Sequence, residues 1–510
     1  MKKNFIPLLF LNVAIIATCG LIYELLAATV SSYVLGDSIT QFSLVIGIYL
    51  SAMGVGSWLS GFLEDNLAKR FIEIELAVAI AGGFSAPLLF LVFAHLSYFN
   101  LIFYPLVFLI GVLVGLEIPL LMRILKNELD FKKLVARVLA LDYVGALVAS
   151  VLFPIFLVPY MGLNRTSLFF GMMNAAVGLW GTWLLEHLIK PKDLTILRIK
   201  GFAVVLVLLT GFIKADSLTA LAEDALYADN IIFAKSSPYQ RIVITKGKAG
   251  YALYLNGNLQ FHSFDEYRYH EALVHPAFAA HNGNPQRILI LGGGDGLALR
   301  EVLKYPVKSV ILVDLDPVMT HLATHFPALK MLNENSMSDS RVQVINQDAF
   351  VWLSETEEEP FDIAIVDFPD PNNFALGKLY TTRFYKLLKS KLKPDATAII
   401  QCTSPLISRK SFWCIVKTLQ SSGFFVEPFN VTVPSFGVWG YALVKSEPFE
   451  IPTKLKAPTA LRFLNEETLK TMFQFSNDTS EPEEEIEINR LNNQILVRYY
   501  EDEWQRFEHQ

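Results

Sequence analysis

Residues 288–316 read ILILGGGDGLALREVLKYPVKSVILVDLD and decide the fold of the second half of the chain. An apolar run is followed by three glycines and Asp295, then by helical spacing, and then by a second apolar run that reaches Asp314. This order predicts a strand, a turn, a helix and a strand built around a nucleoside, and it outweighs the alternative of a turn without a ligand. Gly292 and Gly294 let the backbone approach a ligand where a Cβ would clash. Asp314, about twenty residues beyond the loop, is placed to accept hydrogen bonds from two ribose hydroxyls.

Strand-like and helical segments alternate from residue 286 onward. The strand-like segments are RILILG, SVILVD, VQVIN, FDIAIVD and TAIIQC. Their alternation predicts a Rossmann-like, methyltransferase-type α/β domain, whose mostly parallel sheet binds ligands at the carboxyl ends of its strands. Ahead of this domain, the alternating segments RIVIT and YALYL, with turn residues between and after them, predict a small antiparallel β domain.

Polar residues follow each predicted strand of the α/β domain. They are Asp295 after the first strand, Asp314 after the second, Asp348 after the third, Asp367 and Asp370 after the fourth, and Gln401 after the fifth. One such acid is usually a helix cap. Several in register predict an acidic crevice suited to a ligand with ribose hydroxyls, an exocyclic amine and positive charge.

The first half of the chain has the composition of a membrane protein. Of the 510 residues, 53% are hydrophobic and 18% are charged, and the apolar excess precedes residue 216. About seven segments are long and apolar enough to cross a bilayer, which predicts a multi-pass helical bundle in the cell (plasma or inner) membrane. They are roughly residues 5–33, 41–63, 73–95, 99–122, 138–160, 166–188 and 199–215.

The loops between these segments predict an orientation. Basic residues mark every second connection as cytoplasmic, and they are Lys2 and Lys3, Lys69 and Arg70, Lys126, Lys132, Lys133 and Arg137, and Lys190, Lys192, Arg198 and Lys200. The amino terminus is therefore expected inside the cell. Seven crossings would then place the second half of the chain outside.

Three acidic residues lie within or beside the apolar segments, namely Glu24, Glu117 and Asp142. A carboxylate in hydrocarbon is costly and usually faces a bundle interior, a partner or a water-filled path. Two interpretations stay open: a site for a cation, or a structural role, either pairing, for example of Glu117 with Arg123, or interfacial snorkelling.

Net charge and cysteine content exclude some classes of partner, and the sequence pattern predicts the domain boundaries. A net charge of −6 argues against nucleic acid. The three cysteines provide no disulfide framework and are expected as buried thiols, and no metal site is predicted. We expect a membrane bundle over residues 1–215, a connector and β meander over 216–285, the α/β domain over 286–450 and an extension over 451–510, to which we assign no chemistry.

A series of motifs in the second half resembles the spermidine synthase family of polyamine aminopropyltransferases. The motifs occur in family order and are SSPYQRI, LNGNLQ, DEYRYHE, GGGDG, VDLD, NQDA, DFPDP and PSFGVWGY, over about residues 233–445. The resemblance implies aminopropyl transfer from decarboxylated S-adenosylmethionine to putrescine or a related polyamine. The nucleoside is then a co-substrate, with no tightly bound cofactor.

The resemblance also implies roles for particular residues. Gln240, Asp295, Asp314 and Asp348 would hold the nucleoside with Gly292 and Gly294, and Tyr269, His270, Asp367, Asp370 and Gln401 would line the amine site. Asp367 would act as the general base and Tyr269 would orient the nucleophile. The chain departs from the family at Phe368 and Pro369, where small polar residues are usual, and at Val433, where many members place a Tyr.

Several questions stay open at this stage. A methyltransferase with the same fold would use intact S-adenosylmethionine, and a transporter or sensor would bind a polyamine without turning it over. A combined enzyme and exporter is a further alternative. The chemistry favours a cytoplasmic catalytic half, because its substrate is expected there, whereas the charge bias over seven spans places it outside. A homodimer is expected only by analogy with relatives.

Overall fold

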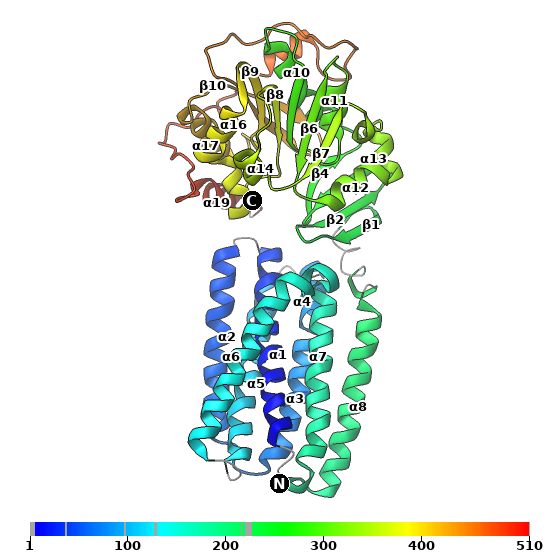
Figure 1. Cartoon of the computed structure of the whole chain (residues 1–510), viewed down its shortest axis with the longest axis vertical. Coiled ribbons are helices and arrows are strands. Elements are labelled where there is room, and N and C mark those ends of the chain that lie inside the picture. The colour runs from blue at the N-terminus through cyan, green and yellow to red at the C-terminus, as the bar shows by residue number, and fades with distance from the viewer. Residues whose placement is uncertain are drawn as a thin grey trace. The chain divides into compact units, whose positions relative to one another are not determined.

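The protein divides into two compact units, Met1–Ala228 and Asp229–Gln510. A computed structural model describes residues 6–35, 38–95, 98–126, 130–215, 217–219 and 227–508 (Figure 1). Lys2, Lys3 and part of the predicted connector lie outside the described residues.

The described residues of the first unit form helices joined by turns and loops, with no strand among them. Its α-helices are α1 (Ile6–Leu35), α2 (Ser38–Ser60), α3 (Leu67–Gly83), α4 (Ser85–His95), α5 (Asn100–Leu125), α6 (Phe131–Leu152), α7 (Val158–Leu184) and α8 (Pro191–Ile213). By length and composition, five helical runs of the described chain are apolar enough to cross a membrane, or six if the bent pair α3 and α4 forms one span. The apolar helices predicted from the sequence are therefore present.

One of these runs, Phe131–Leu184, is 54 residues long and contains α6, a π-helical turn (Phe153–Leu157) and α7. A straight helix of this length would extend about 80 Å, more than twice the apolar thickness of a bilayer. Gly162 interrupts it with a φ of 72° and a ψ of 173°, which lie outside the helical range. The expected segments 138–160 and 166–188 fall on either side of this break.

The second unit begins with the predicted small antiparallel sheet. Its strands are β1 (Asn230–Ser236), β2 (Arg241–Lys246), β3 (Tyr251–Leu255) and β4 (Asn258–His262), in that spatial order. Asn256 and Gly257 join β3 to β4 with φ values of 52° and 83°. Positive φ at both turn residues is typical of a tight hairpin, and Asn-Gly is its favoured sequence.

A seven-stranded sheet forms the centre of the second unit, in the order β10-β11-β9-β8-β5-β6-β7. The strands are β5 (Arg287–Gly292), β6 (Ser309–Asp314), β7 (Val342–Asn346), β8 (Phe361–Asp367), β9 (Leu392–Gln401), β10 (Phe425–Val433) and β11 (Gly437–Lys445). β5 to β9 pair in parallel, and β10 and β11 are antiparallel. The Rossmann-like prediction is confirmed, with all five predicted strands present. The order reverses beside β5, which is where open α/β sheets bind ligands.

Helices cover both faces of this sheet (Figure 1). The helices of this part of the chain are α10 (Glu266–Ala280), α11 (Leu297–Leu303), α12 (Pro317–His325), α13 (Pro327–Leu332), α14 (Ala349–Glu355), α15 (Phe374–Gly377), α16 (Thr382–Ser390) and α17 (Arg409–Ser421). Side chains of β5 alternate between the faces, because successive strand residues point to opposite sides. Leu289 and Leu291 pack with α14, α16 and α17, whereas Ile288 and Ile290 pack with α10 and α11.

The C-terminal extension packs on the second unit through α18 (Glu466–Thr471) and α19 (Ile495–Glu508). The Glu503 carboxylate accepts hydrogen bonds from the backbone N–H groups of Lys410 (2.7 Å) and Ser411 (3.1 Å). These groups belong to the first turn of α17, where a negative charge is stabilised by unpaired N–H groups. This anchor fixes α19 beside the carboxyl ends of the parallel strands.

Candidate active site

A cavity of about 490 Å³ opens at the carboxyl ends of the parallel strands. The structure brings all eleven site residues predicted from the sequence to its wall: Gln240, Tyr269, His270, Gly292, Gly294, Asp295, Asp314, Asp348, Asp367, Asp370 and Gln401. They come from the loop between β1 and β2, from α10, and from the carboxyl ends of the parallel strands with the loops that follow them. The cavity is therefore one site to which distant parts of the second unit contribute.

The glycine loop is shaped by its contact with the neighbouring strand. Gly292 has a φ of 82°, which favours glycine. The Gly294 N–H donates to Asp314 Oδ2 at 3.1 Å. A Cβ at Gly294 would lie 2.6 Å from Asp314 Cγ, so a side chain there would displace the carboxylate. The loop thus holds Asp314 against the backbone at the cavity wall.

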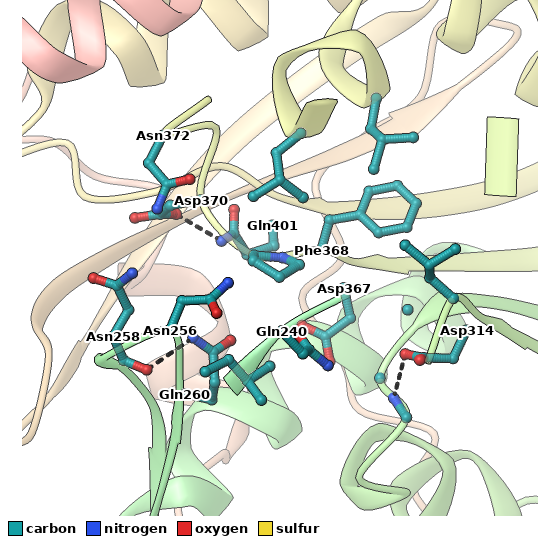
Figure 2. A pocket seen from close by; sticks show the side chains of 18 of the residues that line it. Gln240, Asn256, Asn258, Gln260, Asp314, Asp367, Phe368, Asp370, Asn372 and Gln401 are labelled. Carbon is teal, nitrogen blue, oxygen red and sulfur yellow. Dashed lines mark hydrogen bonds between the residues drawn. The ribbon is translucent and has the colours of Figure 1, made fainter. Parts of the chain in front are cut away.

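The order of the strands arranges the polar side chains in a row. Gln401 ends β9, Asp367 ends β8, the glycine loop follows β5, Asp314 ends β6 and Asp348 follows β7. Figure 2 shows Asp314 on one side of Asp367, with Gln401 and Asp370 on the other. The row therefore has two ends, and Asp367 lies between them.

Tyr269 and Asp367 form the central pair of this row. The Tyr269 hydroxyl donates to Asp367 Oδ1 at 2.6 Å, and Tyr269 is 7% exposed. Burial and the nearby carboxylate raise the pKa of the Tyr269 hydroxyl far above its usual value, so this group stays protonated as a donor. Among the described residues, no side-chain or backbone donor forms a hydrogen bond with the second carboxylate oxygen of Asp367, so this oxygen is available to a ligand.

Burial shifts the titration of the cavity carboxyl groups. It raises the pKa of Asp314 and of Asp367 to about 6 each, and for Asp367 the charge of Asp295 adds to this effect. The pKa values of Asp295 and Asp370 are also raised, chiefly by burial. A cation in the cavity would stabilise the ionised forms, so the site favours positively charged ligands.

Three hydrogen-bond donors surround the Asp370 carboxylate at one end of the row. Its carboxylate accepts hydrogen bonds from Gln401 Nε2 (2.9 Å), the Thr403 hydroxyl (3.0 Å) and the Tyr500 hydroxyl (2.9 Å). Thr403 has a φ of 64°, a costly conformation for a β-branched residue, and such strain occurs often at functional sites. Tyr500 and Trp504 both belong to α19 and line the cavity. The extension that we expected to carry no chemistry thus forms part of the wall.

His270 is held by a buried ionic network behind the cavity wall. Its Nδ1 lies 2.8 Å from Glu266 Oε2, and Arg300 donates to both oxygens of Glu266, at 3.0 Å and 2.9 Å. Burial alone would lower the pKa of His270, but the hydrogen bond and charge of Glu266 outweigh it, and the net pKa is raised. The network fixes α10 against α11 and supports Tyr269, the residue before His270.

At the other end of the row, Gln240 and Asp348, which we expect to contact the nucleoside, already bind other side chains of the protein. Gln240 Nε2 donates to Asp316 Oδ2 at 2.9 Å. Asp348 caps α14 by accepting from the Phe350 N–H (2.8 Å), and its Oδ2 forms a 2.6 Å ion pair with Lys378. A nucleoside at this end would therefore meet a preorganised set of groups.

The lining residues that were missed from the sequence include Asp316, Lys378, Tyr500 and Trp504. Asp316 had a visible signal, because VDLD contains a second acid directly after Asp314. The two departures from the family pattern have packing roles: Val433 is fully buried, and Phe368 packs edge-on against Tyr380.

The fold and the cavity define an α/β protein with a Rossmann-like sheet and a cavity lined by buried carboxyl groups at the carboxyl ends of its parallel strands. A sequence profile described as "Spermine/spermidine synthase domain" matches residues 266–454. The chain is 52% identical over 499 residues to "Polyamine aminopropyltransferase" of Leptospira interrogans, covering 98% of this chain and 99% of the relative. It is 50% identical over 509 residues to "Polyamine aminopropyltransferase 2" of Ralstonia nicotianae, covering 98% of each.

One solved structure that matches part of the chain is that of spermidine synthase in complex with the transition state analogue AdoDATO. It matches with 26% identity and a TM-score of 0.45, covering 49% of this chain and 86% of that chain. Because the chain is at least 50% identical to these two relatives over nearly their whole length, it belongs to the polyamine aminopropyltransferase family. It is therefore an enzyme, and the methyltransferase and non-catalytic alternatives are set aside.

Proposed function

We propose that the protein transfers the aminopropyl group of decarboxylated S-adenosylmethionine to putrescine or a related diamine, giving spermidine and methylthioadenosine. The observation that carries this proposal is the row of polar groups along the sheet edge. Neighbouring strands lie about 4.8 Å apart, so the four intervals from β9 to β7 span about 19 Å. This length accommodates an extended nucleoside and a short diamine placed end to end.

The order of groups in the row matches the order of parts in the two substrates. Asp348 would accept the adenine amine, Asp314 the ribose hydroxyls, and the loop with Gly292, Gly294 and Asp295 would lie beside the sulfonium and its aminopropyl chain. Gln240 would close this end through its bond to Asp316. A carboxylate beside the aminopropyl group would also repel the extra carboxylate of intact S-adenosylmethionine, which favours the decarboxylated form.

Asp367 would serve as the general base at the junction. The lone pair of the amine nitrogen attacks the carbon next to sulfur, the carbon–sulfur bond breaks, and its electrons pass to sulfur to leave a neutral thioether. The nitrogen loses a proton to Asp367, while Tyr269 holds the carboxylate in place. Alignment of both substrates would contribute on the order of 7–11 kcal/mol to lowering the barrier.

The far end of the diamine would lie in the region formed by His270, Asp370, Gln401 and α19. Asp370 supplies a negative charge for the distal ammonium group, and its three donors keep the carboxylate in a fixed position. Trp504 offers an aromatic face, which attracts an ammonium group. We infer that α19 limits the length of the amine that the site accepts.

We further propose that the helical unit spans the cell membrane and that the catalytic unit lies in the cytoplasm. The long apolar helices support the first part. The second part is supported by the chemistry, because the nucleoside substrate is expected inside the cell, and it opposes the charge bias over seven spans. A reporter fused to the carboxyl terminus would be active in the cytoplasm if the proposal is right, and active only outside the membrane if it is wrong.

The experiment that tests the transferase proposal uses purified full-length protein in detergent. Methylthioadenosine release is followed with decarboxylated or intact S-adenosylmethionine and with diamines of increasing chain length. We expect release only with the decarboxylated nucleoside plus an amine, and a maximum near the length of putrescine. Methylation by intact S-adenosylmethionine, or release that does not depend on the amine, would contradict the proposal.

A further inference from the structure

Four carboxyl and amide side chains lie deep in the helical unit without a hydrogen-bond partner among the described residues. Asn12 of α1, Glu75 of α3, Glu117 of α5 and Asn174 of α7 are each at most 1% exposed. None of their side-chain nitrogen or oxygen atoms has a hydrogen-bond partner within the described chain. An unpaired buried polar group costs about 1–3 kcal/mol, and an unpaired charge costs more. Buried polar groups in proteins are almost always paired, so this set requires an explanation.

The two carboxyl groups lie close to each other. Glu117 interacts electrostatically with Glu75, and both interact with the Cys19 thiol of α1. Cys19 in turn contacts α7, because its Sγ lies 3.9 Å from the Phe170 carbonyl oxygen. Glu75 and Glu117 therefore occupy one layer of the bundle, at the centre of α1, α3, α5 and α7.

Asn174 lies on the face of α7 that packs on Glu75. Gly171 and Gly178 flank it by three and four residues, and residues at this spacing share a helix face. A Cβ at Gly178 would lie 3.1 Å from Glu75 Cβ, and one at Gly171 would lie 2.8 Å from the Ala79 carbonyl oxygen. Asn174 is thus directed toward α3 between these two contacts.

Asn12 lies on the same face of α1 as Cys19, seven residues or two turns away. The pairing of Glu117 with Arg123, one of the alternatives that the sequence left open, is not observed among the described residues, since Arg123 donates to the Ser60 carbonyl oxygen. Glu75 was not singled out from the sequence. The layer therefore combines two carboxyl groups with the Asn174 amide, and none of these side chains has a hydrogen-bond partner among the described residues.

We propose that this layer, formed by Glu75, Glu117 and Asn174, is a second binding site that accepts a primary ammonium group of a polyamine. An ammonium group carries a positive charge and three N–H donors. Two carboxylates and an amide oxygen supply the matching charge and acceptors. Intramembrane carboxylates usually mark such ligand paths. The choice of a polyamine as the ligand rests on the proposed function of the catalytic unit.

The first test uses the unaltered full-length protein. A hydrophobic carbodiimide modifies carboxyl groups in apolar surroundings, and peptide mass spectrometry reports the rate at Glu75 and Glu117. We expect 1 mM spermidine to slow labelling at Glu117 at least fivefold, and sodium or potassium chloride of equal ionic strength to leave it unchanged. Equal protection by either salt would assign the site to an inorganic cation and overturn the proposal, as would no protection at all.

The second test counts bound spermidine by equilibrium binding in lipid nanodiscs. The wild type should bind two molecules per chain, and Glu75→Gln and Glu117→Gln should each lose one of them. Glu73→Gln is the matched control, because Glu73 lies on the same helix but pairs with Arg70 at 3.5 Å, and it should keep both. Unchanged stoichiometry in both test variants would overturn the proposal.

Methylthioadenosine release by the same preparations separates the two proposals. Glu75→Gln and Glu117→Gln should retain the transferase rate of the wild type, because neither residue lines the catalytic cavity. If the proposed transferase function fails, no amine will support release in any preparation. Protection of Glu117 from the carbodiimide would still be measured in that case.

Discussion

Replacement of Asp367 by Asn removes the proposed base while keeping the shape of the side chain. The amide oxygen of Asn can still accept the Tyr269 hydroxyl, which lies 2.6 Å from Asp367 Oδ1 in the wild type. An alkylamine titrates near 10, so roughly 0.3% of it is unprotonated at pH 7.5. A positioned base typically contributes about 10²–10⁴ in rate, which corresponds to about 3–5 kcal/mol in the barrier. We therefore expect kcat to fall at least about a hundredfold.

The assay is methylthioadenosine release at saturating substrates, with nucleoside affinity measured separately by calorimetry. Affinity for methylthioadenosine should change less than about threefold, because Asp367 faces the amine in the proposed arrangement. The rate of the variant should rise about tenfold per pH unit between pH 7.5 and 9.5, as the amine loses its own proton. A similar loss of rate and of nucleoside affinity, or a loss of rate below tenfold, would refute the role of base.

Asp362→Asn is the matched control for this experiment. Asp362 lies at the opposite end of β8, where it pairs with Lys393 at 2.7 Å and accepts hydrogen bonds from the backbone of Gln286 and Arg287. The substitution removes the same charge from the same strand but away from the cavity. It should lower the free energy of unfolding and leave kcat near the wild-type value.

Three further outcomes test the cavity. The pKa of Asp367 and of Asp314 is raised to about 6, so the proposed base is protonated in acid. We therefore expect kcat/KM to rise with pH between about 5 and 7 and then to level off. A flat profile over this range would contradict the assignment of Asp367 as the base. Gly294→Ala places a methyl carbon 2.6 Å from Asp314 Cγ. Calorimetry should therefore show that methylthioadenosine binding is weakened about tenfold or more. Unchanged affinity would show that the loop is not part of the nucleoside site. Tyr500→Phe deletes a hydrogen bond that lowers the pKa of Asp370. Steady-state kinetics should therefore show a KM for the diamine raised about tenfold, with unaltered nucleoside affinity. A loss of affinity confined to the nucleoside would contradict the role of Tyr500 in the amine region.

The sheet and its ligand edge were predictable from the sequence for a physical reason. Apolar runs such as 287–292 and 361–367 are buried on both faces, and their carboxyl ends must meet at one edge when the strands are parallel. Acids at those ends were therefore expected to share a cavity, and the structure places them on one wall. The functional roles assigned to them remain predictions.

Other parts of the site could not be predicted because they depend on tertiary contacts between distant residues. Tyr500 meets Asp370 across 130 positions of sequence, and Lys378 meets Asp348 across 30. No periodicity or motif marks such pairs. Glu75 was missed for a similar reason, since IEIEL in a helix with Arg70 nearby has the pattern of an interfacial segment, and only the packing of α7 shows that it is buried.

The central claim is that one cavity holds a sulfonium nucleoside and an amine on either side of Asp367. Structure determination of the full-length protein with methylthioadenosine and putrescine both bound tests this claim most directly. The account predicts the adenosine between Asp348 and Asp314, and an amine nitrogen within about 3.2 Å of an Asp367 carboxylate oxygen. An amine bound outside this cavity, or a nucleoside that does not contact Asp314, would contradict it.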